Sequence, residues 1–320
     1  MEKKPLVSFI IPVYNIPIGL LSECLDSILS LSLRKHEREI IVIDDGSQSS
    51  PLSKLDNYLD DIIFIRQKNG GLGSARNRGI LNVTGQYIQF IDADDALIAN
   101  QYEHCLDLIR FSSPDMVMFN FSRKEKSQKI YNDQPAISGR ELMRHHNIKA
   151  TAWGYLFKST ILGKLRFTPD IFHEDEEFTP LLILRAETII QSDAEAYFYR
   201  QRKESITTSE NPRNILKRLN DFKEVILRLN QTADVIHGID RLALLRRVHQ
   251  LTMDYIYKII VETRNKQYLE RQLEDLRKKG LFPLPDRNYT TKYRWFRRLT
   301  NSKVGLTFLL RTIPLIKKEK

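Results

Sequence analysis

Cysteine is scarce in this chain, and long apolar runs are missing from it. The 320 residues include two cysteines, too few for a disulfide scaffold or a cysteine-rich zinc site. No run approaches the ~20 apolar residues of a transmembrane helix, and the longest late stretch, 304–316, is interrupted by Arg311 and Pro314. The first residues also lack the apolar region of a secretory signal. We therefore expect a cytoplasmic protein.

Charge is unevenly distributed along the chain. Residues 1–210 hold 25 Lys and Arg against 29 Asp and Glu, whereas residues 211–320 hold 25 against 11. The net charge of +10 therefore comes from the last third. Such an asymmetry indicates two regions with different partners. We expect a catalytic and ligand-binding domain over residues 1–210 and a basic helical extension over residues 211–320.

Strand and helix patterns alternate over the first 120 residues. Short β-branched and aromatic runs are separated by stretches in which apolar residues recur at helical spacing. The predicted strands are 7–11, which Pro12 would end, 39–43, 62–65, 87–91 and 116–119. Their nearly continuous apolar character predicts an α/β fold with a mostly parallel sheet flanked by helices. Further on, 153–157 and 197–199 indicate strands, and 211–279 is typical of helices.

Three carboxylates in four residues follow the fourth predicted strand. Asp92, Asp94 and Asp95 would repel one another unless positive charge lay among them. A divalent cation such as Mg²⁺ or Mn²⁺ prefers carboxylate oxygens and could bridge a diphosphate. An acidic N-cap of the next helix would explain one aspartate but not three. The cluster therefore favours a metal site at the carboxyl edge of the sheet, where open α/β sheets bind ligands.

Two further loops belong to the same predicted edge. Residues 69–77 form a glycine-rich loop that runs into a helix, where backbone N–H groups can approach an anion, and Arg76 adds a fixed positive charge. A dinucleotide fingerprint fits poorly, because Arg76 stands at its third glycine position and the aspartates would stay unexplained. Asp44 and Asp45 alone would make an ordinary turn. Because they belong to the same predicted edge of the sheet, one of the two carboxylates could accept hydrogen bonds from a base or a ribose.

Four ordered motifs give the chain a resemblance to bacterial family 2 glycosyltransferases. They are 10–15 (IIPVYN), 39–47 (EIIVIDDGS), 71–79 (GLGSARNRG) and 85–95 (GQYIQFIDADD). Three later segments resemble the polysaccharide-making members of that family: 153–157 (WGYLF), 173–175 (HED) and 199–206 (YRQRKESI). Each motif is common singly, but their order is specific. The resemblance covers about residues 5–208.

The resemblance implies an inverting transferase of the GT-A fold, which is Rossmann-like. It would be a hexosyltransferase with a UDP-sugar donor, a Mn²⁺ or Mg²⁺ cofactor and a glycan or lipid-linked acceptor in cell-surface polysaccharide synthesis. By motif position, the residues implied to bind the nucleotide sugar are Pro12, Tyr14, Asn15, Asp44, Asp45, Gly71, Arg76, Asp92 and Ala93, with Tyr14 stacking on the base. The residues implied at the metal are Asp92, Asp94 and Asp95, and the choice between the last two is open.

Asp175 is implied to be the general base. Its three glutamate neighbours would raise its pKa through like charge, which suits a base. Without the resemblance, residues 174–177 would be interpreted as the acidic first turn of a helix, where the helix dipole favours negative charge. Trp153 is a candidate for the acceptor side because sugars pack on aromatic faces, and core packing is an equally open role. His173 and Glu174 are weaker acceptor-side candidates.

Other functions are weighed against this one. A non-catalytic nucleotide-sugar-binding module with the same fold is the alternative, and intact Asp94 and Asp175 positions argue against it. A nucleotidyltransferase would carry a glycine-rich basic loop after the first strand, where 14–17 (YNIP) stands instead. The basic tail could suit nucleic acid, but no nucleic-acid-binding motif is found, so we expect no nucleic-acid partner.

The end of the chain is basic and amphipathic. Residues 277–320 hold 13 Lys and Arg against two acids, with aromatic and aliphatic residues interleaved. Such a segment suits the surface of an anionic bilayer, and we expect peripheral binding to the inner face of the plasma membrane. Packing of this segment on the catalytic domain, with solvated charges, is the alternative.

Overall fold

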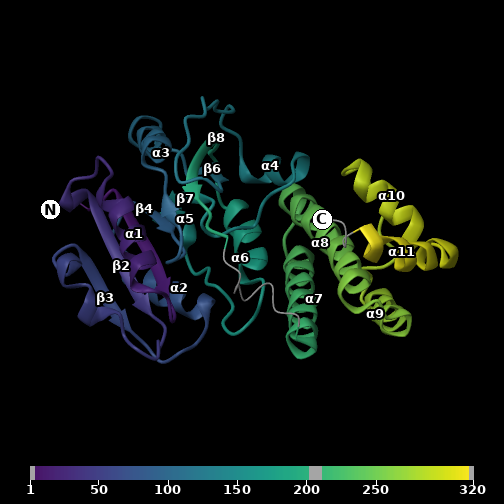
Figure 1. The fold of residues 1–320 in the computed structure, drawn as a ribbon. Helices are drawn as coiled ribbons and strands as arrows, with labels where there is room; N and C mark the ends of the chain where they lie inside the picture. Colours follow the sequence, from purple (N-terminus) through teal and green to yellow (C-terminus); the bar gives the residue numbers. More distant parts are fainter. Residues whose placement is uncertain (1–3, 202–210, 317–320) are drawn as a thin grey trace. The chain divides into compact units, whose positions relative to one another are not determined.

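The computed structural model describes residues 4–201 and 211–316 of the chain (Figure 1). They belong to two compact units, Met1–Leu142 with Ile148–Lys203, and Met143–Asn147 with Glu204–Lys320. The domain boundary predicted after residue 210 adjoins residues 202–210, which lie outside the described residues, so that boundary stays a prediction. Three members of the 199–206 motif, Arg202, Ser205 and Ile206, lie outside them too.

The first unit is built on one eight-stranded sheet. Its order is β3-β2-β1-β4-β7-β6-β8-β5. The strands are β1 (Val7–Val13), β2 (Arg38–Asp44), β3 (Ile62–Arg66), β4 (Tyr87–Phe90), β5 (Ala96–Leu97), β6 (Met116–Ser122), β7 (Tyr155–Lys158) and β8 (Ile189–Phe198). β1 pairs in parallel with β2 and β4, and β2 pairs in parallel with β3. The carboxyl ends of these four strands therefore meet at one edge.

The other half of the sheet is mixed. β6 and β8 run parallel, whereas β7 is antiparallel to both β4 and β6, and β5 is antiparallel to β8. The predicted mostly parallel sheet flanked by helices is confirmed. The antiparallel strands are short: β7 lies between the two parallel groups, and β5 lies at the edge of the sheet.

Helices cover both faces of this sheet (Figure 1). The helices of the first unit are α1 (Ile18–Leu29), α2 (Leu72–Ile80), α3 (Ala99–Phe111), α5 (Ser159–Leu162) and α6 (Glu174–Ile183), and α4 (Gly139–His145) runs from the first unit into the second. Three 3₁₀ turns, Lys35–Glu37, Leu52–Lys54 and Asp56–Tyr58, lie in the loops. α2 lies so close to β1 that a Cβ on Gly79 would stand 2.3 Å from the Ile10 side chain. Gly79 therefore sets the distance between helix and sheet.

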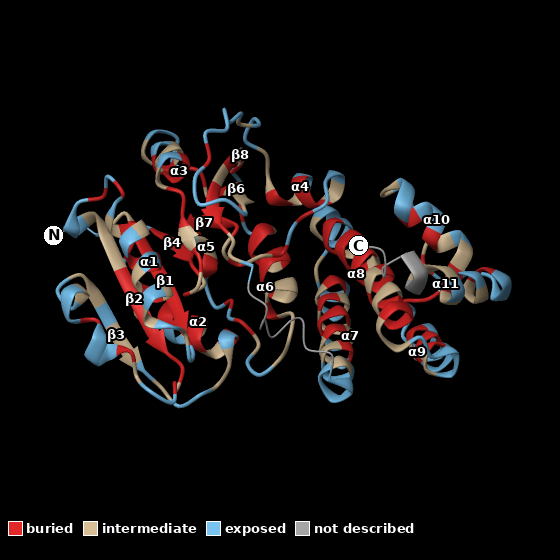
Figure 2. Ribbon diagram, viewed as in Figure 1, coloured by how far each residue is buried: buried red, intermediate tan, exposed pale blue. Residues whose placement is uncertain are grey.

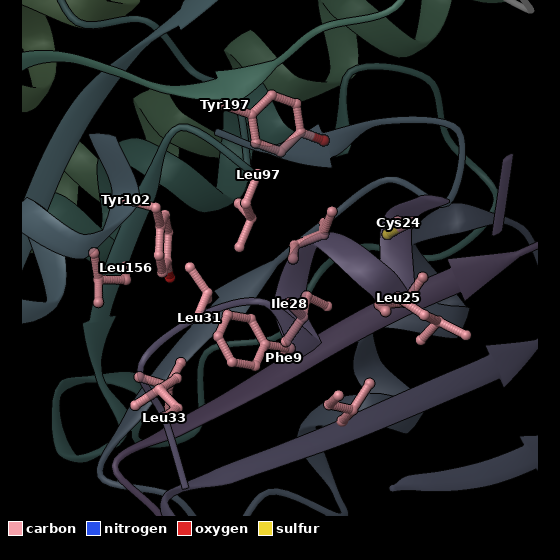
Figure 3. Close-up of a cluster of buried hydrophobic side chains, with 14 of the residues drawn as sticks. Phe9, Cys24, Leu25, Ile28, Leu31, Leu33, Leu97, Tyr102, Leu156 and Tyr197 are labelled. Atoms are coloured by element: carbon pink, nitrogen blue, oxygen red, sulfur yellow. The ribbon is translucent and has the colours of Figure 1, made fainter. Parts of the chain in front are cut away.

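The main core lies between α1, α3 and one face of the sheet (Figure 3). Alternate residues of β1 enter it, including Phe9, whose ring centroid is 6.2 Å from that of Tyr102 on α3. Leu25 and Ile28 of α1 pack against the same cluster and are fully buried. Because β1 is buried along its whole length, its sequence is apolar at consecutive positions rather than at alternate ones.

Two strands differ from their prediction. β1 continues through Pro12 to Val13, so the prediction that Pro12 ends it was wrong. The last backbone hydrogen bond that β1 makes on the β4 side runs from Ile91 N to Ile10 O. Pro12 faces the same side two residues later, beyond the end of β4. The missing N–H of proline therefore leaves no ladder bond unmade. β8 begins at Ile189, eight residues before the predicted strand at 197–199.

The second unit is helical. Its helices are α7 (Pro212–Val235), α8 (Gly238–Thr263), α9 (Lys266–Lys278), α10 (Thr291–Thr300) and α11 (Lys303–Ile316). α8 is the central one, since α7, α9, α10 and α11 all contact it. Within residues 4–201 and 211–316, no helix is both long and apolar enough to cross a membrane.

His249 of α8 makes the stability of the second unit depend on pH. Its Nδ1 lies 2.8 Å from the Tyr289 hydroxyl, and burial together with the charge of Arg287 lowers its pKa to about 4. The unfolded chain protonates histidine at higher pH, so stability is complete above about pH 7 and falls as the pH drops toward about 4.

We predict that His249→Gln removes this pH dependence. The wild type should lose on the order of 1–2 kcal/mol of unfolding free energy between about pH 7 and about pH 5 relative to the variant. Urea unfolding at each pH, followed by circular dichroism, measures the difference. His237→Gln, at an exposed position, is the control and should keep the wild-type profile. Parallel pH profiles for wild type and His249→Gln would contradict the assignment.

Candidate active site

The loops after β1 and β2 are tied together by hydrogen bonds. Asn15 N donates to Ser47 Oγ at 3.0 Å, and Gln48 N donates to Asn15 Oδ1 at 2.9 Å. Asn15 adopts a positive φ of 51°, a conformation that asparagine tolerates better than most residues. Pro12 is buried just before this point, whereas Tyr14 is 47% exposed. An exposed ring at the carboxyl edge of a parallel sheet is available for stacking on a flat ligand.

Asp45 organises the glycine-rich loop. Its Oδ1 accepts hydrogen bonds from Gly70 N at 2.9 Å and Gln67 Nε2 at 2.7 Å, and its Oδ2 accepts one from Gly71 N at 2.8 Å. Gly71, directly before α2, has a φ of 83°, where a side chain would be strained. The carboxylate thus fixes the loop that begins α2. Its predicted contact with the nucleoside stays a prediction.

Asp44 is fully buried beneath this loop. Its Oδ1 accepts a hydrogen bond from Ser47 N at 2.9 Å, and its Oδ2 lies 3.5 Å from Arg66 Nε. These contacts shape the turn after β2. The predicted part of Asp44 in binding the nucleotide sugar stays a prediction.

Arg76 joins two acidic segments that lie far apart in the sequence. From α2, it donates to Asp92 Oδ1 at 3.0 Å and to Glu174 Oε1 at 2.7 Å. The side chain is 3% exposed and its guanidinium lies 5.3 Å from the Phe167 ring centroid. Burial lowers its pKa, but the charges of Asp92 and Glu174 outweigh burial and raise it, so Arg76 is a cation. The sequence placed Arg76 at the nucleotide; in the structure its two terminal nitrogens bind protein carboxylates.

The turn after β4 holds the clustered aspartates in different environments. Asp92 and Asp94 are partly exposed, whereas Asp95 and Ala93 are each 3% exposed. Asp95 accepts a hydrogen bond from Tyr197 Oη at 2.8 Å on one oxygen and one from Arg200 N at 2.8 Å on the other. Burial and the charge of Asp92 raise the pKa of Asp95 to about 8, against the effect of these hydrogen bonds.

Tyr197 and Arg200 are the residues that the sequence did not assign to the site. The Tyr197 hydroxyl also accepts a hydrogen bond from Asp92 N at 3.1 Å. Arg200 Nε donates to Asp94 O at 3.0 Å, and its guanidinium pairs with Glu23 of α1. Arg200 was visible in the 199–206 motif. No sequence signal singled out Tyr197, although a tyrosine hydroxyl needs a hydrogen-bond partner when it is buried.

These environments decide which aspartates suit a cation. The two Asp95 oxygens already accept hydrogen bonds from Tyr197 of β8 and from Arg200 just after it. Asp92 and Asp94 are the partly exposed pair, and their carboxylate oxygens are ligands that hard cations prefer. Among the described residues, no three His, Cys, Asp or Glu side chains are arranged to hold a metal by themselves. Mg²⁺ is commonly bound through one or two carboxylates and substrate phosphates, and the Asp92–Asp94 pair fits that pattern.

Asp175 lies in the first turn of α6, beside Glu174. Its Oδ1 accepts a hydrogen bond from Glu176 N at 2.9 Å. Burial, followed by the charges of Glu174 and Glu176, raises the pKa of Asp175 well above the ordinary carboxyl value, and Arg76 opposes this shift. The structure therefore provides a carboxylate whose proton affinity is high, and Arg76 connects its neighbour Glu174 to Asp92.

The acceptor-side candidates lie around this centre. His173, directly before α6, has a left-handed φ of 65°. Trp153 is partly buried and stacks on Tyr197, with centroids 4.4 Å apart and planes 12° apart. Trp153 therefore supports the residue that holds Asp92 and Asp95. Contact of Trp153, His173 or Glu174 with an acceptor stays a prediction.

Residues 8–167 match the protein family described as Glycosyl transferase family 2. The match covers half of the chain, and the chain belongs to this family. The predicted family is therefore confirmed. The glycosyltransferase GlyA of Streptococcus pneumoniae is 29% identical over 222 residues, which are 63% of this chain and 31% of that protein. The chain spans between 31% and 63% of the length of the curated relatives it matches first.

Solved structures share the fold. Residues 1–349 of TarS from S. aureus, in complex with UDP-GlcNAc, superpose with a TM-score of 0.68 at 17% identity, covering 98% of this chain and 92% of that one. A mannosyltransferase from Pyrobaculum calidifontis, in complex with GDP-Man and Mn²⁺, superposes with a TM-score of 0.56 at 14% identity, covering 99% of this chain and 88% of that one. The GT-A fold with a C-terminal helical region is confirmed.

We predict that Arg76→Met strongly destabilises the first unit. Removing one partner of a buried ion pair leaves charges without compensation, which typically costs about 3–5 kcal/mol. Arg78→Met is the matched control, because Arg78 is exposed on the same helix, and it should change stability by less than about 0.5 kcal/mol. Urea unfolding measures both variants.

A double variant separates the ion pair from simple loss of packing. Adding Glu174→Gln to Arg76→Met removes one of the two carboxylates left unpaired, so it should recover part of the lost stability. If the double variant is less stable than Arg76→Met by the full cost of Glu174→Gln alone, the two residues do not interact and the bridge is disproved.

Proposed function

We propose that this protein is an inverting glycosyltransferase that moves a sugar from a nucleotide-sugar donor, a UDP-sugar, to a glycan or lipid-linked acceptor in cell-surface polysaccharide synthesis. The observation that carries the proposal is the Arg76 bridge. It ties the Asp92 turn, suited to a donor diphosphate, to the helix start that bears Asp175, suited to an acceptor hydroxyl. Family membership and the UDP-GlcNAc named with the TarS structure support this choice.

On the donor side, each loop of the carboxyl edge has a role. Tyr14 stacks on the base, Asp45 and Gly71 set the loop against the nucleoside, and Asp92 with Asp94 would hold a Mn²⁺ or Mg²⁺ ion. When bound, such an ion stabilises the negative charge that develops on the departing diphosphate. We assign Asp94 rather than Asp95 to the metal, because the Asp95 carboxyl is buried and bonded to Tyr197 and Arg200.

On the acceptor side, Asp175 acts as the general base. The acceptor hydroxyl oxygen forms a bond to the anomeric carbon while the bond from that carbon to the diphosphate oxygen breaks. The bonding electrons leave with the nucleoside diphosphate, and the hydroxyl proton passes to Asp175. One displacement from the opposite face inverts the anomeric configuration. A base with a raised pKa holds this proton better than an ordinary carboxylate would.

A screen of nucleotide sugars tests the function directly. The protein is incubated with each donor and Mn²⁺, with and without glycan acceptors, and the released nucleoside diphosphate is measured. Release with one donor class, increased by an acceptor, is expected. Donor binding without any release across acceptors would instead support the non-catalytic binding module.

We predict that Asp94→Asn abolishes transfer and greatly weakens donor binding, because it removes a charged ligand of the cation. EDTA should have the same effect, reversed by added Mn²⁺. Asp107→Asn is the control, since Asp107 lies exposed on α3, and it should keep wild-type activity. Full activity in the presence of chelator would disprove the metal assignment.

We predict that Asp175→Asn lowers turnover by about 10²–10⁴-fold while donor affinity stays nearly unchanged. The base works when deprotonated, so wild-type activity should rise with pH through a pKa well above the usual carboxyl range near ~4. The variant should lose this acid limb. A variant that keeps most of its activity with an unchanged acid limb would show that another group, Glu174 first, is the base.

A further inference from the structure

α10 and α11 each pack on α8 through one face. Tyr293 and Phe296 of α10 are buried, and the Phe296 ring lies edge-on to Tyr257 of α8, with centroids 6.4 Å apart. Leu309 of α11 is 5% exposed, and α11 contacts both α8 and α10. One apolar face of each helix is therefore used for packing within the second unit.

The opposite face of α10 is aromatic and basic. Trp295 is 59% exposed, and the Arg298 guanidinium lies 5.6 Å from its ring centroid. Arg294 is exposed beside them, whereas the Lys292 Nζ lies 5.2 Å from the ring centroid of Tyr257 on α8. Positions 294, 295 and 298 follow helical spacing, so they share one side of α10.

α11 repeats this arrangement. Val304 is 82% exposed and Phe308 is 54% exposed. Positions 304, 308 and 311 share one side of the helix, which therefore ends in the exposed Arg311, and Lys303 is exposed at its start. Figure 2 shows exposed stretches on both helices. These exposed residues of α10 and α11 are called the outer face below.

The charge of this region has one sign. Residues 287–313 contain seven Lys and Arg and no Asp or Glu. The preceding acid, Asp286, pairs with Arg297 at 2.6 Å. A merely solvated basic helix has no need of an exposed Trp, Val and Phe, so packing on α8 does not account for the outer face.

We propose that the outer face of α10 and α11 docks on an anionic lipid bilayer. Lysine and arginine there would lie at the lipid phosphates while Trp295, Val304 and Phe308 enter the interface, where aromatic residues are favoured. A second copy of the chain fits less well, because a symmetric contact would place like charges together. The helices lie on the bilayer rather than crossing it, in keeping with their length and polarity.

The experiment uses the full chain with phosphatidylcholine vesicles that do or do not contain phosphatidylglycerol. Co-sedimentation with the anionic vesicles, weakened by salt, and none with the neutral ones is expected. The chain has two tryptophans, Trp153 and Trp295, so insertion is also seen as a blue shift of the Trp295 emission and as its quenching by brominated lipid.

Three variants assign the binding to the outer face. Arg294→Gln with Arg298→Gln should weaken partitioning about 25-fold, since each basic residue contributes about fivefold. Trp295→Phe should bind nearly as the wild type but lose the blue shift, and Trp295→Ala with Phe308→Ala should bind on the order of tenfold or more weakly. Lys266→Gln and Val235→Ala, exposed on α9 and α7, are the matched controls.

Failure of the bilayer proposal can be distinguished from failure of the proposed enzymatic function. No binding to anionic vesicles at low salt, or equal loss in the control variants, disproves it. Binding to a soluble polyphosphate with no blue shift on vesicles shows a polyanion site instead and also disproves it. Because the outer face contains no residue proposed for catalysis, sugar transfer to a soluble acceptor is measured in parallel and should stay at the wild-type level in these variants.

Discussion

A single buried guanidinium holds the candidate site together. Arg76 lies between Asp92, which follows a central strand, and Glu174, which begins α6. Without a cation at this point, two acidic segments would face each other in a poorly hydrated environment, where like charges repel strongly. The contact also explains how Asp175 can have a raised pKa without the whole helix start being driven apart. Arg76 donates a hydrogen bond to the neighbouring Glu174, while burial and the charges of Glu174 and Glu176 raise the pKa of Asp175.

The carboxylates of the site fall into two kinds. Asp44, Asp45 and Asp95 are buried and their oxygens bind backbone or side-chain groups of the protein. Asp92 and Asp94 are partly exposed. Residues of the first kind shape loops, whereas those of the second kind can meet a ligand. What separates the two kinds is exposure, since Asp92 also accepts a hydrogen bond from Arg76.

Much of the fold could be predicted from the sequence because β1 and β4 are buried along their whole length and most of β2 is buried, so that these strands are largely apolar. β3 is only partly buried, but its first four residues are apolar as well. β8 was predicted only in its last residues, since its inward positions include Ser192, Ala194 and Ala196, which are too small to give an apolar signal. The loops of the site were located by their position after strands. The role of Arg76 could not be predicted, because its partners Asp92 and Glu174 lie 16 and 98 residues away.

The turn that bears Asp95 is synthesised early, but its hydrogen bonds can form only after much later residues have been synthesised. Both groups that hold the Asp95 carboxyl, Tyr197 and Arg200, stand more than 100 residues further along the chain. Domains fold as their segments emerge from the amino end, so the first four strands can form while this carboxyl still lacks its donors. Docking of β8 then fixes the turn. The acidic turn is therefore synthesised well before β8, but it reaches its final geometry only when β8 has joined the sheet.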